Sequence, residues 1–278
     1  MNKEEYIKII NEKLINDNSR KIIISQIKKY YEIKDNIKLN EHNYKIGDDV
    51  FLKKGTLLHW TYKNLDGLKE IVKLGLISSW FIDGRMAKYP SCVGVWNLKK
   101  DYYLKDYIDF YSGGTIKYRN MDNSKTSTNV ISYSNMSNIM EIIKKSGYFS
   151  WKLEQTKESR FLPSLTQDKI QIGIIMNGNN LELKELLKGD ILSLNINDED
   201  VKEFVNSDYY NDFVKLRKEK DDFFTDRESA ILFGIPACFI EGILVGRIYE
   251  KDDKILNEIK KLLPNCYICN LDGKVVVE

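Results

Sequence analysis

The sequence predicts an α+β fold, in which strands and short helices alternate without the regular repeat of a doubly wound sheet. Apolar residues recur at helical spacing near the N-terminus, and short β-prone runs are scattered through the rest of the chain. No internal repeat or low-complexity linker separates these segments. The 278 residues are sufficient for one large domain with an extension.

Composition excludes several classes of protein. Hydrophobic residues make up 42% of the chain and charged residues 30%, which is typical of a globular protein. The 43 basic and 41 acidic residues nearly balance, which argues against a histone-like coat of charge but permits a local nucleic-acid groove. No apolar run approaches the roughly 18 residues of a membrane span, no secretory signal is evident, and the four cysteines suggest no disulfide framework. We therefore expect a cytoplasmic protein without a membrane partner.

The first 48 residues predict a helical N-terminal extension. Apolar residues recur at helical spacing from Ile7 to Leu14, and the pattern continues beyond Ser19, a candidate helix N-cap. The polar stretch NEHNYKIGDD then interrupts it. The sequence therefore predicts a helical extension at 1–48 and a larger second domain at 49–278.

The remainder alternates irregularly between strands and helices. Strands are predicted at 56–61, 91–98, 129–134, 169–177, 190–196, 228–234, 240–246 and 273–278. Helices are predicted at 64–75, 135–147, 181–189, about 199–219 and 252–264. Gly75 is the predicted C-terminal cap of the first of these helices, and Pro236 marks a tight bend between two consecutive strands.

Two motifs have alternative interpretations. Cys266 and Cys269 have the spacing of metal ligands, but a zinc site needs about four ligands, and other candidates are single and scattered. We therefore expect two ordinary buried thiols and no metal. The Gly113-Gly114 pair is either a phosphate-cradling turn or a bulge that bends a strand. No Walker loop, GxGxxG or GxSxG motif is present.

Three further features are candidates for chemistry. His59, one of two histidines, stands at the tip of a predicted strand, where the alternative is a core histidine. Glu228 begins a predicted strand, where the alternative is a solvated carboxylate. Aromatic residues around Tyr107 and Tyr111 form either core or a stacking wall for a planar ring.

Taken in order, these residues resemble the ADP-ribosyltransferases, and most closely the DarT family of DNA ADP-ribosyltransferase toxins. In that family a strand carrying H-x-T is followed by N-L-x-x-I-x-x-x-G-L, comparable to LLHWTYKNLDGLKEIVKLGLIS here. An aromatic segment follows, where this chain has KDYIDFYSGGTIKY, and a catalytic glutamate later heads a strand, comparable to DRESAILF. The resemblance covers residues 51 to about 247.

The resemblance implies a fold of split mixed and antiparallel sheets with flanking helices, and NAD as co-substrate. It implies that Glu228 is the catalytic carboxylate, with Glu241 in reserve. The glutamate of the family also aligns two residues later, with Ala230, and its arginine after the aromatic segment is replaced by Gly113-Gly114. The implied cofactor-binding residues are His59, Thr61, Asn64, Arg85, Tyr107 and Tyr111.

The implied reaction transfers ADP-ribose from NAD to a nucleic acid base, with DNA the favoured acceptor, as in a toxin or phage-defence effector. A carboxylate beside the ribose stabilises the positive charge that develops as nicotinamide leaves, and takes a proton from the nucleophile. An antitoxin or regulatory protein is an implied partner. The alternatives are an RNA or protein acceptor, NAD hydrolysis, a non-catalytic binding module on the same scaffold, and an effector whose helical N-terminus binds a partner.

Overall fold

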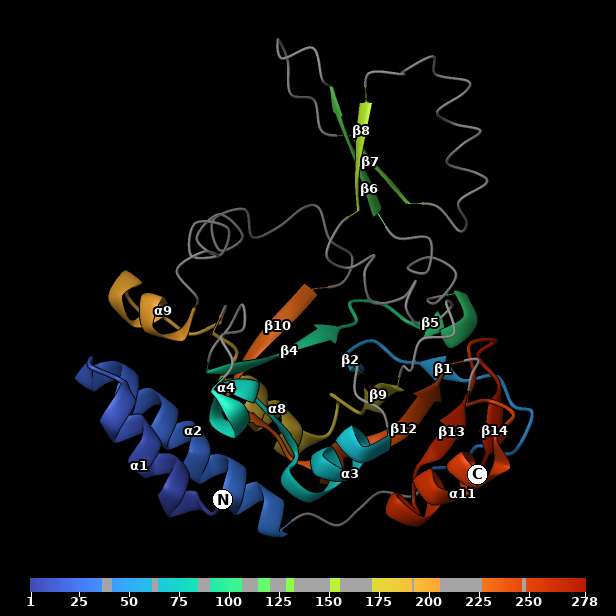
Figure 1. The fold of residues 1–278 in the computed structure, drawn as a ribbon, viewed down its shortest axis with the longest axis horizontal. Coiled ribbons are helices and arrows are strands. Elements are labelled where there is room, and N and C mark those ends of the chain that lie inside the picture. Colours follow the sequence, from blue (N-terminus) through green and yellow to red (C-terminus); the bar gives the residue numbers. More distant parts are fainter. Residues whose placement is uncertain are drawn as a thin grey trace.

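A seven-stranded mixed sheet is the centre of the part of the chain that the computed structural model describes (Figure 1). The described residues are 1–36, 42–61, 65–84, 91–106, 115–120, 129–132, 151–155, 172–191, 193–205, 227–246 and 249–278. The strands, in their spatial order, are β10 (Arg227–Leu232), β4 (Cys92–Asn97), β2 (Leu57–Thr61), β9 (Ile172–Met176), β12 (Ile240–Val245), β13 (Tyr267–Cys269) and β14 (Val275–Val277). Only the β12–β13 pair is parallel in this sheet.

Side chains alternate between the two faces of the sheet and separate two apolar cores. Leu57 and Ile174 belong to a larger core, whereas their chain neighbours Leu58 and Ile175 belong to a smaller one. This is the two-residue period of a strand buried on both faces. The sheet is therefore the middle layer of the structure.

Helices cover the face of the larger core. They are α1 (Lys3–Lys13), α2 (Asp17–Asn36), α3 (Leu65–Leu74), α4 (Ser79–Asp83), α8 (Leu181–Leu187), α9 (Asp198–Phe204) and α11 (Asp253–Leu262). Each contributes buried apolar side chains to this core. Helices α1 and α2 lie side by side beneath the sheet in Figure 1, and α3 and α11 lie beneath its other half.

The opposite face has a thinner cover. Strands β1 (Phe51–Leu52) and β5 (Tyr102–Tyr103) pair with each other and contribute Leu52 to the smaller core. The members of the smaller core are Val50, Leu52, Leu58, Leu98, Leu104, Ile175, Leu244, Tyr267, Cys269, Leu271 and Val275. This core has far fewer members than the larger one.

Two further small sheets are described. Strands β3 (Leu76–Ile77) and β11 (Gly234–Ile235) pair antiparallel, and a short 3-10 helix at Ala237–Phe239 connects β11 to β12. The other sheet has the order β7-β6-β8, all antiparallel. Its strands are β7 (Asn129–Ser132), β6 (Thr115–Asn120) and β8 (Trp151–Gln155).

The N-terminal helices begin at clear capping residues. Asn2 and Glu5 form a capping box at the start of α1. The start of α2 is capped by Asn16, whose Oδ1 accepts the backbone N–H groups of Asn18 and Ser19. The prediction that Ser19 is the cap is therefore wrong. Ser19 lies three positions beyond the cap, inside the helix, and its hydroxyl donates instead to the buried Asp200 at 2.8 Å.

An aromatic cluster joins these helices to the sheet. The ring of Phe233 lies 4.9 Å from that of Tyr6, 4.9 Å from that of Tyr30 and 5.2 Å from that of Phe81, measured between centroids. Phe233 has a φ of 67°, a conformation that costs a non-glycine residue roughly 1 kcal/mol or more. The edge-to-face packing of the fully buried rings offsets this cost. The helices of the predicted extension thus contribute to the same core as the sheet.

Most predicted elements are present, with some corrections. The strand predicted at 190–196 is reduced to a single antiparallel bridge between Asp190 and Ile231, after which the chain turns and the Ser193 and Leu194 N–H groups donate to the Asp190 carbonyl. The helix predicted to run to about 219 ends at Phe204, because Val205 is extended, and the residues from 206 to 226 lie outside the described part. The predicted helix at 135–147 also lies outside it. Strands β1, β3, β5, β8 and β13 were not predicted.

The structure confirms an α+β class with a mixed sheet and flanking helices. The predicted domain boundary near residue 48 falls between α2 and β1. No described helix combines the length and the apolar character needed to cross a bilayer.

Candidate functional site

Strands β2 and β4 form backbone pairs at one end and separate at the other. Their ladder holds two described pairs, Leu57 with Asn97 and Leu58 with Trp96. Beyond these pairs β2 continues along β9 as far as Thr61, and β4 continues along β10 as far as Cys92. The facing backbone edges of the two strands therefore do not pair with each other from His59 to Thr61 of β2.

His59 occupies the point at which the two strands part. Its Nδ1 lies 2.9 Å from the carbonyl oxygen of Gly94 on β4. A carbonyl only accepts, so Nδ1 carries the proton and donates. The side chain thus replaces a backbone donor that the ladder no longer supplies.

The protonation state of His59 follows from its surroundings. Burial lowers its pKa below the ordinary value of 6.5, and the hydrogen bond to Gly94 offsets part of this effect. The imidazole is therefore neutral at pH 7, with its proton on Nδ1. In this tautomer Nε2 is a hydrogen-bond acceptor.

The helix that follows β2 is fixed at its C-terminal end. Gly75 has a φ of 85°, and its N–H donates to the Ile71 carbonyl at 2.7 Å, which confirms the predicted cap. The Tyr30 hydroxyl of α2 donates to the neighbouring Leu74 carbonyl at 2.6 Å. Helix α3 buries Leu68 and Ile71 in the larger core, so it holds its position behind the sheet.

Glu228 lies on β10, two strands away from the strand of His59. Its backbone pairs with Trp96, which pairs in turn with Leu58. Only β4 separates β10 from β2. Ala230, the alternative position for the family's glutamate, pairs with Gly94 and is fully buried.

The remaining predicted site residues are only partly described. Thr61 ends β2, where its backbone pairs with Ile172, and its side chain lies outside the described part. Asn64, Arg85, Tyr107 and Tyr111 lie outside the described residues altogether. The Gly113-Gly114 pair lies outside them as well.

The reserve carboxylate, Glu241, lies at a different place. It sits on β12 at a bulge between Ile240 and Gly242, and it lines a cavity of about 460 Å³. Burial raises its pKa to about 7, although the positive charge of Lys53 acts in the opposite direction. This cavity includes Tyr44 and Tyr267, which pack on the smaller core, so it opens on the face opposite Leu57 and His59.

Cys266 and Cys269 have the surroundings of ordinary thiols. Both are buried, and their Sγ atoms donate to the Ile240 and Ile243 carbonyls at 3.1 and 3.6 Å. Burial raises the pKa of Cys266 to about 12. Among the described residues, no group of three or more His, Cys, Asp or Glu side chains could hold a metal ion.

Sequence reasoning undervalued Glu241, which resembles an exposed turn residue in its local sequence. Its cavity is lined by His42, Asn43, Tyr44, Asp48, Phe51, Lys53, Thr56, Asn177, Glu241 and Tyr267. These residues come from four separate segments, so no local pattern brings them together. The one available signal is a carboxylate inside an otherwise apolar strand, IEGILV.

Comparison of the chain with protein-family models, with curated proteins and with solved structures gives no match.

Proposed function

We propose that this protein is an NAD-dependent mono-ADP-ribosyltransferase that modifies a nucleic acid base, with DNA the favoured acceptor. The observation that carries the proposal is the parting of β2 and β4 at His59, with the strand of Glu228 on the other side of β4. An ADP-ribosyltransferase-like split sheet is the finer fold that we propose for the same reason.

The parted strands suit the nicotinamide end of NAD. A carboxamide has both a donor and an acceptor, and it is satisfied by a strand edge that offers both. The edges of β2 at 59–61 and of β4 at 92–95 do not pair with each other, so they have this capacity. Thr61 adds a hydroxyl-bearing residue at the end of β2.

His59 suits a ribose hydroxyl. Its Nδ1–H is held by Gly94, so the ring cannot exchange the roles of its nitrogens without losing this bond. The neutral Nε2 accepts a proton donor, and a hydroxyl of the adenosine ribose supplies one. With Nε2 fixed as an acceptor, His59 would orient the bound NAD and take no part in the chemical step.

Glu228 is proposed as the group that assists the transfer. The bond between the ribose C1′ and the nicotinamide nitrogen breaks, and its electron pair neutralises the pyridinium as nicotinamide leaves. A carboxylate stabilises the positive charge on the ribose. A nitrogen of the acceptor base then bonds to C1′, and its proton passes to the carboxylate.

Labelled NAD tests the proposal directly. The protein is incubated with adenylate-labelled NAD and, separately, with single-stranded DNA, RNA and total protein, while nicotinamide release is recorded. Label on DNA, absent with Glu228→Gln, is the expected result. Label on RNA or protein would show that DNA is not the acceptor. Nicotinamide release without label on any acceptor would indicate NAD hydrolysis. No nicotinamide release with any acceptor would refute the proposed enzymatic activity.

A further inference from the structure

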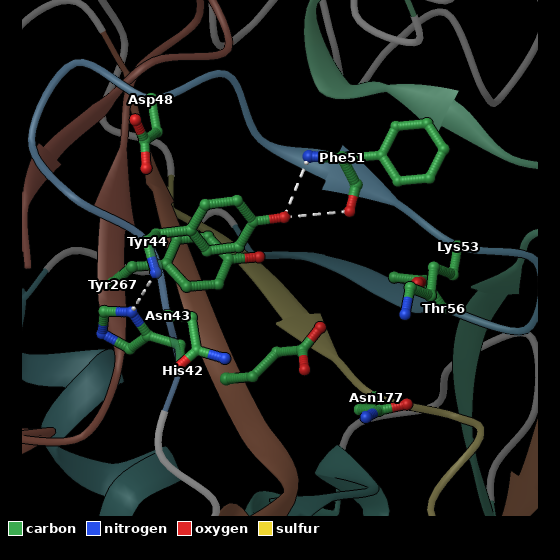
Figure 2. Close-up of a pocket in the computed structure, with 10 residues that line it drawn as sticks. His42, Asn43, Tyr44, Asp48, Phe51, Lys53, Thr56, Asn177 and Tyr267 are labelled. Atoms are coloured by element: carbon green, nitrogen blue, oxygen red, sulfur yellow. Dashed lines mark hydrogen bonds between the residues drawn. The ribbon is translucent and has the colours of Figure 1, made fainter.

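The cavity beside Glu241 is separate from the parted strands. It lies on the face of the smaller core, and its volume of about 460 Å³ falls within the common range for small-molecule sites of roughly 300–1,000 Å³. Figure 2 shows His42, Tyr44 and Tyr267 grouped on one side of it and Lys53, Thr56 and Asn177 on the other.

One wall of the cavity is aromatic and preorganised. The Tyr44 and Tyr267 rings meet edge to face at 4.7 Å, and the His42 ring meets that of Tyr267 at 5.3 Å. The Tyr44 hydroxyl donates to the Phe51 carbonyl and accepts the Phe51 N–H, both at 3.0 Å (Figure 2). Its hydrogen-bonding capacity is largely used, so Tyr44 offers a ligand mainly its ring.

The same wall is uncharged at neutral pH. The backbone N–H of Tyr44 donates to Nδ1 of His42 at 3.3 Å, so the ring proton of neutral His42 is on Nε2. Burial and the nearby charge of Lys260 lower the pKa of His42, with Glu278 acting in the opposite direction. A cation that enters the cavity therefore meets no positive charge from His42.

Glu241 brings a carboxylate to this cavity. The bulge at Ile240 and Gly242 turns its position out of the regular ladder, as bulges do where a side chain is re-aimed. Among the described residues its carboxylate makes no hydrogen bond and no ion pair. A half-buried carboxylate without a donor is unfavourable unless a ligand or water supplies one.

We propose that this cavity binds a small organic cation, whose ammonium or guanidinium group pairs with Glu241 and lies against the rings of Tyr44 and Tyr267. Aromatic faces attract cations, and charge-assisted hydrogen bonds to a carboxylate are the strong ones. An anion would instead meet Glu241 and Asp48, and a neutral molecule would leave the carboxylate without a counter-charge. Lys53 is exposed, so water screens its repulsion of the ligand.

Matched ligands test the inference on the full chain. Titration calorimetry with n-butylammonium and n-butylguanidinium is compared with 1-butanol, which has the same apolar tail and no charge. We expect both cations to bind at least about tenfold more tightly than the alcohol, the effect of one charge-assisted hydrogen bond. Glu241→Gln should weaken cation binding by about the same factor, whereas Glu182→Gln, at an exposed position of α8, should leave it unchanged.

A pH series gives a second readout. Cation affinity should fall as the pH drops from about 8.5 to about 5.5, because protonated Glu241 has no charge. The other titratable groups around Glu241 are His42, Tyr44, Asp48, Lys53, Cys266 and Tyr267. Equal binding of butanol, unchanged binding to Glu241→Gln, or no binding of either cation would each overturn the inference. Glu228→Gln should bind the cations normally, so this result is independent of the transferase assay.

Discussion

The Nδ1 of His59 lies 2.9 Å from the carbonyl oxygen of Gly94, at the residue where β2 and β4 stop pairing. One side-chain hydrogen bond therefore performs two tasks. It gives the Gly94 carbonyl a donor where the β2–β4 ladder supplies none, and it fixes the imidazole tautomer in which Nε2 is an acceptor.

Substitutions of His59 separate these tasks. His59→Leu leaves the Gly94 carbonyl without its donor and should lower the free energy of unfolding by about 1–3 kcal/mol. His59→Asn can keep a donor near Nδ1 and should lose less. Both variants lack Nε2, so both should bind NAD at least about tenfold more weakly, as expected for one lost hydrogen bond. Urea unfolding and NAD calorimetry on the Glu228→Gln background measure the two effects, and wild-type NAD affinity in both variants would place the NAD site elsewhere.

Glu228→Gln should keep the fold and lose transfer by at least about a hundredfold, the scale for one electrostatic or general-base group. The matched control is Glu241→Gln, which changes the other candidate carboxylate in the same way. Initial rates of nicotinamide release, with circular dichroism as a check on folding, distinguish them. A reversed result, with Glu241→Gln inactive and Glu228→Gln active, would exchange their roles.

Glu241 should make stability depend on pH. Its carboxyl pKa is raised from 4.5 to about 7 in the folded chain, so the folded state holds the proton more tightly than the unfolded state. This contribution is fully present below about pH 4.5 and is lost as the pH rises through about 7. Glu241→Gln cannot lose a proton and should be more stable than wild type at about pH 8.5, by up to about 3 kcal/mol.

Urea unfolding of both proteins between about pH 4 and pH 9 checks this expectation. The two stability curves should run together below about pH 4.5, diverge between about pH 4.5 and pH 7, and stay a constant distance apart above about pH 7. Curves that stay parallel over the whole range would show that Glu241 has an ordinary pKa.

A chain that begins at Tyr44 should not fold. Removing α1 and α2 deletes five almost fully buried apolar side chains, and the burial of each contributes roughly 1.5–3 kcal/mol. They are Tyr6, Ile10, Ile23, Ile27 and Tyr30. The sum is comparable with the whole stability of a typical protein, about 5–15 kcal/mol. Size-exclusion chromatography and near-ultraviolet circular dichroism should show aggregation or lost packing, whereas Lys8→Ala, on the exposed side of α1, should behave as wild type. A soluble, well-packed truncated chain would mean that these helices are dispensable.

The sequence predicts those elements whose pattern is local and strong. The strand LLHWT and the helix at 252–264 have clear periodicity, and Gly75 is predicted as a cap because glycine readily adopts a positive φ. Residues 190–196 show why pattern alone fails. Ile191 and Ile196 pack in the larger core, but the contact with β10 is a single bridge at Asp190, whose side chain accepts the Ala230 N–H while the chain turns.

The candidate site is less predictable because it depends on distant residues. The residues His59 and Gly94 are 35 positions apart, and their hydrogen bond depends on where two strands separate. Glu241 has a raised pKa because its cavity is completed by His42 and Tyr267, which no local window contains. Strand β13 has only three residues, too few for a period to be evident.

The contact between Ser19 and Asp200 joins residues 181 positions apart, and Phe233 completes the aromatic cluster from still further along the chain. During synthesis α1 and α2 emerge from the ribosome first, and although Leu74 and Phe81 follow early, Asp200 and Phe233 are made much later. Helix α1, with 11 residues, is marginal alone in water, and α2, with 20, depends mostly on the packing of its apolar side for stability. Their apolar sides are therefore not fully covered until about residue 235 has been translated, and this favours completion of the core late in synthesis or after release.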